Sequence, residues 1–167
     1  MSSIKNFKTQ QHLDTISKWT DSHEMLLNCE KTKYMIFNFC HSAQFSTRLQ
    51  LNNNALEQVR ETRLLGVTIS SDLTWHSNTN KLVSKAYQRM IILRNLYQFN
   101  VPVEDMIKIY ILFIRSMVEQ SCVVWASSIT AEEENSLERT QKCALRLIFK
   151  EKYQTYSNAL ILSGALI

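Results

Sequence analysis

Turn-forming residues are scarce in this chain, and that scarcity limits the folds it can adopt. Only two glycines and one proline occur among its 167 residues. Glycine and proline dominate tight turns, so their rarity favours long helices joined by short connections. A chain of this length buries about 70% of its unfolded surface, and it therefore needs neither disulfides nor metal ions to fold.

The hydrophobic period changes near Trp75. Before it, a helical stretch over about 10–22 precedes several strand-length runs. These runs are EMLLN, KYMIFNF, STRLQL and RLLGVTI, with LNNNALE as a turn before the last. Gly66 lies inside the last run, where we expect a bulge or a close backbone contact. Residues 1–75 therefore predict one helix with a small antiparallel sheet.

After Trp75 the period is helical. We expect helices over about 76–98, 103–125 and 130–150, and a short one from Tyr153. Asp72 or Thr74 can cap the first of these helices, and Thr130 with Glu133 fits a capping box for the third. The predicted fold class is α+β: a first domain over 1–75, and a three- to four-helix bundle over 76–167.

Composition and the apolar segments of the sequence indicate in which compartment the protein occurs. The net charge of +4 is mildly basic, and the four cysteines lie too far apart for a zinc motif. The N-terminal residues MSSIKNFKTQQHLD lack the apolar core of a signal peptide. The most apolar segment, Ile107 to Val118, contains Lys108 and Arg115 and is short for a bilayer span. We therefore expect an intracellular protein without a membrane partner.

A basic stripe runs along the first predicted bundle helix. Lys81, Lys85 and Arg89 follow one another at i, i+4 and i+8, beside an apolar face that begins at Leu82, and the helix contains no acidic residue. Like charges at this spacing weaken an isolated helix, and a nucleic-acid backbone along the stripe would relieve the repulsion. The alternative is an ordinary solvated flank.

The sequence offers no set of catalytic carboxylates. A two-metal phosphoryl-transfer site needs clustered acids that hold two ions about 4 Å apart. The only aspartates are isolated ones, at Asp14, Asp21, Asp72 and Asp105. The run Glu132 to Glu134 fits a helix start, where the helix dipole favours acids. We therefore expect no metal or other cofactor in this chain.

Four motifs in order resemble one family. These are LDTISKW from Leu13, MLLNCEKTK from Met25, RLLGVTI from Arg63 and DLTWH from Asp72. Together they resemble the downstream end of reverse transcriptases of non-LTR (LINE-like) retrotransposons, closest to the jockey-like group. The similarity extends from about Leu13 to Ile148.

The resemblance implies roles for particular residues. Lys31 matches the late palm motif called D, whose lysine is thought to assist departure of pyrophosphate. Leu65, Gly66 and Val67 match the primer grip, and the helical bundle matches the thumb. The implied partner is a template–primer duplex, bound weakly and without sequence preference. The alternative for Lys31 is an exposed turn lysine.

The sequence also departs from the family. The catalytic A-D-D hairpin, whose aspartates hold Mg²⁺ in the full-length family, would lie before Met1. We therefore expect a truncated reverse transcriptase that does not polymerise DNA by itself. The alternative is a non-catalytic structural or protein-interaction module, which self-associates through an exposed sheet edge.

Overall fold

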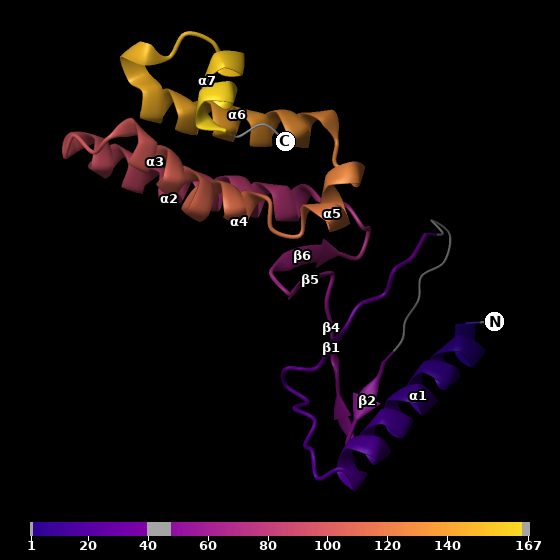
Figure 1. Ribbon diagram of the computed structural model, residues 1–167. Helices are drawn as coiled ribbons and strands as arrows, with labels where there is room; N and C mark the ends of the chain where they lie inside the picture. Colours follow the sequence, from indigo (N-terminus) through magenta and orange to yellow (C-terminus); the bar gives the residue numbers. More distant parts are fainter. Residues whose placement is uncertain (1, 40–47, 165–167) are drawn as a thin grey trace. The chain divides into compact units, whose positions relative to one another are not determined.

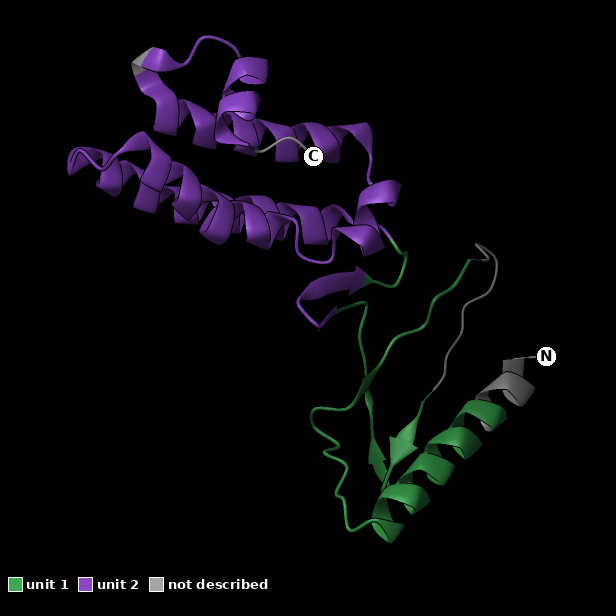
Figure 2. Ribbon diagram, viewed as in Figure 1, with its two compact units in different colours: residues 1–62, 70–73 green, residues 63–69, 74–167 purple. Residues whose placement is uncertain are grey.

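The computed structural model describes residues 2–39 and 48–164, and the chain divides into two compact units (Figures 1 and 2). Unit 1 comprises residues 1–62 and 70–73, and unit 2 comprises residues 63–69 and 74–167. The predicted α+β class is confirmed, because unit 1 combines a helix with short strands and unit 2 is mainly helical.

Unit 1 is built on one helix, α1 (Ser2–Ser22), which ends where the sequence predicts. Its Gln10 side chain holds the strand β2 (Gln50–Leu51) at both backbone groups. Gln10 Nε2 donates to the Gln50 carbonyl at 2.8 Å, and the Gln50 N–H donates to Gln10 Oε1 at 3.0 Å. A small core of Leu49, Leu51 and Leu56 completes the unit.

The strands within the described residues are shorter than the sequence predicts and form three two-stranded pairs. Met25 to Asn28 is not a strand, and β1 covers only Lys33–Tyr34. β1 pairs in parallel with β4 (Glu57–Gln58), so the expected antiparallel pairing is wrong for the run KYMIFNF. The Asn52–Asn53 turn between β2 and β3 (Asn54–Ala55) is as predicted, and both asparagines have positive φ. Part of the predicted third strand run lies outside the described residues.

The run RLLGVTI is a hairpin rather than one strand. β5 (Glu61–Leu64) and β6 (Val67–Ser70) pair across a two-residue turn at Leu65 and Gly66. Both turn residues have positive φ, 49° and 94°, as two-residue hairpin turns require. Gly66 therefore marks the turn itself, and not a bulge within a strand.

Unit 2 is a helical bundle (Figure 1). Its first helix, α2 (His76–Gln98), has the predicted bounds, and its N-cap is Trp75 rather than Asp72 or Thr74. The predicted capping box of α6 (Ala131–Phe149) is confirmed by reciprocal bonds between Thr130 and Glu133. The last helical segments are η3 (Lys150–Lys152) and α7 (Tyr156–Ser163).

The predicted helix over 103–125 is interrupted. It consists of α3 (Val103–Ile109), a π-helical segment η1 (Tyr110–Arg115), α4 (Ser116–Val118), α5 (Cys122–Trp125) and the 3₁₀ turn η2 (Ala126–Ser128). Two carbonyls of the π segment accept hydrogen bonds from side chains. Ser116 Oγ donates to the Leu112 carbonyl, and Arg89 donates to the Phe113 carbonyl. Ser121, with φ of 56°, separates α4 from α5.

The core of unit 2 lies between α2, α3–η1 and α6. Its most deeply buried side chains include Met90, Leu93, Met106, Ile114 and Leu145.

One stretch of unit 2, Val103–Ser128, is long and apolar enough to cross a membrane, and 22% of its most apolar window is buried. Its series of helical segments ends at Ser128, three residues beyond the predicted end of the helix. Tyr110 and Ile114 within it are core residues, at 3% and 2% exposure. That the chain has no membrane partner stays a prediction.

Candidate nucleic-acid interface

The basic stripe lies on one side of α2. Leu82 and Ala86 face the core, while Lys81 and Lys85 are exposed and Arg89 is half-buried. The Lys85 ammonium has no ion-pair partner among the described residues. The helical spacing that predicted a basic edge beside an apolar face is therefore present in the structure.

Arg89 is held against the π-helical segment. Its guanidinium donates to the Phe113 carbonyl, and its central carbon lies 5.2 Å from the centre of the Phe113 ring. Both partners are uncharged, so the positive charge of Arg89 is positioned without being neutralised.

Arg63 joins two residues of the stripe in one pocket. The pocket has a volume of about 320 Å³ and contains the cationic side chains of Arg63, Lys85 and Arg89. Its remaining walls come from Gly66, Leu82, Gln88, Met117 and Gln120. None of these lining residues, all within the described ranges, carries a carboxylate. We call this site the electropositive pocket; it attracts anions and offers amide donors beside the three charges.

The turn residue Gly66 is confined by its neighbour Gln120. A Cβ placed on Gly66 would lie 2.7 Å from Gln120 Nε2, and the φ of +94° already disfavours any other residue. Arg63 Nε donates to the Gly66 carbonyl at 3.4 Å, a long contact across the turn. Because Gly66 has no side chain, the hairpin tip can lie close to Gln120 and form one wall of the pocket.

A buried asparagine attaches the hairpin to α2. Asn78 Oδ1 accepts from the backbone N–H of Thr68 at 3.0 Å, and both residues are buried. Val67 packs in a cluster with Leu82 and Trp125. Of the three predicted primer-grip residues, Val67 is thus buried at 7% exposure, while Leu65 at the tip is 88% exposed.

Sequence reasoning missed several residues of this site. Arg63, Gln88 and Gln120 have no distinctive sequence pattern, and only the folded hairpin brings Arg63 to the stripe. Asn78, a polar residue near the start of α2, was likewise not identified. Lys81, in contrast, was predicted and does not line the pocket; it lies one turn before Lys85 on α2.

Lys31 lies in unit 1, in a turn that Asn28 organises. The Lys31 N–H donates to Asn28 Oδ1 at 3.0 Å, and the Thr32 N–H donates to the Asn28 carbonyl at 3.0 Å. Lys33 pairs with Glu57 Oε2 at 2.7 Å, whereas the exposed Lys31 ammonium has no ion-pair partner among the described residues. Lys31 is therefore an exposed lysine in a turn, and its role as the motif D lysine stays a prediction.

The carboxylates do not fit the Mg²⁺ site that the resemblance implies for the full-length family. Within residues 2–39 and 48–164, no group of three or more His, Cys, Asp or Glu side chains lies close enough to hold a metal ion. Asp105 pairs with Lys108 at 2.9 Å, an arrangement of two surface side chains on α3. We derive no catalytic step through a metal.

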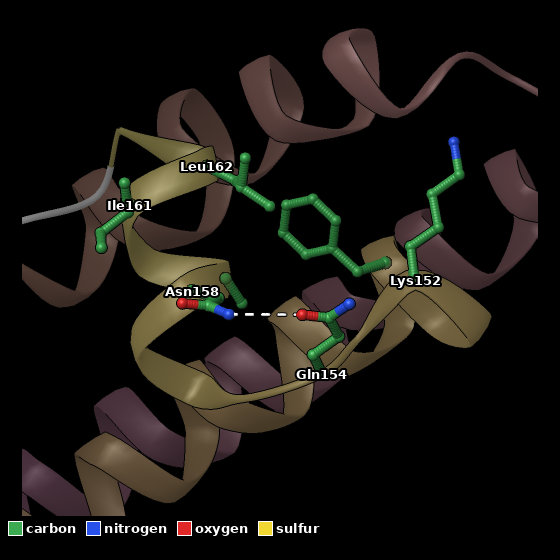
Figure 3. A pocket seen from close by; sticks show the side chains of 7 residues that line it. Lys152, Gln154, Asn158, Ile161 and Leu162 are labelled. Atoms are coloured by element: carbon green, nitrogen blue, oxygen red, sulfur yellow. Dashed lines mark hydrogen bonds between the residues drawn. The ribbon is translucent and has the colours of Figure 1, made fainter.

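A further small pocket lies by the last helix, and Lys152 is the one charged residue in its lining (Figure 3). It has a volume of about 300 Å³, and Asn158 Nδ2 donates to Gln154 Oε1 at 3.4 Å along one side. The Lys152 side chain extends away from these two amides (Figure 3). This pocket shares no lining residue with the electropositive pocket.

Comparisons with known proteins found no matching family model, no matching curated protein and no matching solved structure. The resemblance to non-LTR reverse transcriptases rests on the motifs of the sequence and stays a prediction.

Proposed function

We propose that this chain is a reverse-transcriptase-like protein whose unit 2 binds the sugar–phosphate backbone of a nucleic-acid duplex. The contact surface is the electropositive pocket together with Lys81 on the adjoining turn of α2. Binding is weak and independent of sequence, because cationic side chains that meet phosphates do not read bases.

The observation that carries this proposal is that the hairpin formed by RLLGVTI and the basic stripe of α2 line the same pocket. The hairpin that resembles a primer grip contributes Arg63 and Gly66, and the basic stripe of α2 contributes Lys85 and Arg89, to the same pocket. Three cations without a carboxylate repel one another, and an anionic backbone offsets that repulsion.

Catalysis is not part of the proposal for this chain alone. Polymerase chemistry needs clustered carboxylates, and the four aspartates of the sequence are isolated. Lys31, exposed in its turn, keeps the proposed motif D role only in the company of such a site.

The test is the salt dependence of duplex binding. Each neutralised phosphate contributes about −0.9 to the slope of log affinity against log salt, so the three pocket cations contribute roughly −2.7. The triple variant R63Q/K85Q/R89Q removes these charges, and Gln preserves the helix propensity of α2. We expect it to flatten the slope by about that amount.

A matched control is available on α6 and at its C-cap, Lys150. Lys142, Arg146 and Lys150 have the same i, i+4, i+8 spacing and lie outside the electropositive pocket. The variant K142Q/R146Q/K150Q removes the same net charge, and we expect it to keep most of the slope. Equal losses in the two variants would show that duplex binding depends on net charge alone, and the proposed site would be rejected.

A second candidate function, a non-catalytic interaction module, is favoured by exposed apolar side chains. Leu26 in unit 1 is 95% exposed and Phe39 is 76% exposed. Side chains of this size at such exposure are typical of surfaces that partners cover. Duplex binding that is insensitive to salt and to the pocket variants would leave this function as the better account.

A further inference from the structure

A second cavity in unit 2 differs in size and chemistry from the electropositive pocket. It has a volume of about 830 Å³ and lies between η1–α5 on one side and α6 on the other. Pockets of about 300 to 1,000 Å³ are the usual size for organic ligands. The two sites share no lining residue.

The walls of this cavity are mainly apolar. Ile114 and Trp125 are 2% and 3% exposed, and Val118, Ile129 and Leu137 lie around them. The indole Nε1 of Trp125 donates to the Gln120 carbonyl at 3.2 Å, so its one polar atom is already paired. The walls therefore suit a branched or aromatic hydrocarbon body.

The charged groups that line the cavity are mostly acidic. Arg115 is its one cationic side chain, and Arg115 Nε contacts Glu119 Oε1 at 2.6 Å, which compensates its charge. Glu138 pairs with Lys142 at 2.9 Å. Glu134 is exposed and has no ion-pair partner among the described residues. The cavity thus contains one carboxylate without an ion-pair partner, and its charge is opposite to that of the electropositive pocket.

The other polar lining residues are neutral: Tyr110, Asn135, Thr140 and Gln141. Burial raises the pKa of Tyr110 to about 12, so this phenol stays protonated at physiological pH. It adds no charge to the cavity wall, and the sign of the site is set by the glutamates.

We propose that this cavity binds amphipathic organic amines, with the ammonium group at Glu134 and an aromatic body against Val118, Ile129 and Leu137. Phosphates and carboxylates are disfavoured by the same glutamate. The proposal is independent of duplex binding, because each site can fail without the other.

Naphthylmethylamine is a suitable probe, and naphthoate is its matched acid with the same aromatic body. Each compound is titrated into the full chain while the methyl NMR signals of Ile114, Ile129 and Leu137 are followed. We expect the amine to bind with a dissociation constant of about 1 mM or tighter. We expect the acid to bind about tenfold more weakly, because attraction to an exposed carboxylate becomes repulsion.

Two variants and one control localise the binding. Glu134→Gln should weaken amine binding by up to about fivefold, the upper range for an exposed charge pair. Glu132→Gln lies in the same first turn of α6 and does not line the cavity, so it should leave the affinity unchanged. Ala126→Trp places an indole at an exposed lining position, and we expect it to abolish the methyl shifts.

Three results obtained with the probes and variants would overturn the proposal, and a fourth concerns the unaltered chain. They are equal or tighter binding of the acid, an unchanged affinity in Glu134→Gln, and amine-induced shifts that survive Ala126→Trp. Absence of any methyl shift with the amine in the unaltered chain would overturn it as well.

Discussion

Gly66 is the residue on which the geometry of the electropositive pocket depends most closely. Its φ of +94° lies in the region that favours glycine, and its missing side chain leaves room for Gln120. A larger residue there must strain the turn or displace Gln120 from the pocket wall. The hairpin tip and the stripe of α2 would then no longer form the same surface.

Gly66→Ala should lower the free energy of unfolding by about 2 to 3 kcal/mol, combining backbone strain with a steric conflict. Gly164→Ala is the matched control, since Gly164 has φ of +63° but no neighbouring atom within 4 Å of the position that a Cβ would occupy. We expect that variant to cost only about 1 kcal/mol. Urea unfolding followed by tryptophan fluorescence measures both. Equal costs would show that the Gln120 contact does not constrain Gly66.

At the scale of elements, α2 and α6 were predictable, whereas the start of α1, the interruptions within 103–125 and the strands were not. The bounds of α2 and the capping box of α6 followed from hydrophobic period and local hydrogen-bonding chemistry, which act within a few residues. The hairpin in RLLGVTI was missed because Leu65, a residue that rarely adopts positive φ, occupies half of its turn. The π segment was also missed, and its Phe113 carbonyl accepts from Arg89, a contact between residues distant in sequence.

The same reasoning explains which part of the candidate site was predictable. Lys85 and Arg89 were found because helical spacing alone places them on one side of α2. Arg63 and Gln120 reach the pocket only through tertiary packing of the hairpin tip, and no local pattern encodes that contact.

The capping box gives a prediction at this scale. Thr130→Ala removes the acceptor of the Glu133 N–H and should destabilise unit 2 by about 1 to 2 kcal/mol. Thr155 caps the shorter helix α7 through one bond to Asn158, and Thr155→Ala should cost about 0.5 kcal/mol. Thermal unfolding followed by circular dichroism compares the two variants. Equal losses of stability in Thr155→Ala and Thr130→Ala would contradict the expectation that the cap of α6 stabilises unit 2 more than the cap of α7.

At the scale of the whole molecule, the small core of unit 1 leaves apolar side chains uncovered. We expect self-association at tens of micromolar, a range in which exposed apolar surfaces aggregate. Leu26→Lys should reduce it, because Leu26 is 95% exposed. Val123→Lys, at a 90% exposed position of unit 2, is the matched control and should have less effect. Sedimentation velocity measures the association, and a monomeric unaltered chain would contradict the expectation.

The central claim is that a duplex backbone meets the electropositive pocket, and arginine side-chain NMR tests it most directly. The Nε–H signals of the chain are followed while a short duplex is added at low salt. The account predicts that the signals of Arg63 and Arg89 shift and saturate together, and that those of Arg139 and Arg146 on α6 stay in place. Shifts confined to the α6 arginines, or no shift at Arg63 and Arg89 under conditions where the duplex binds, would contradict it.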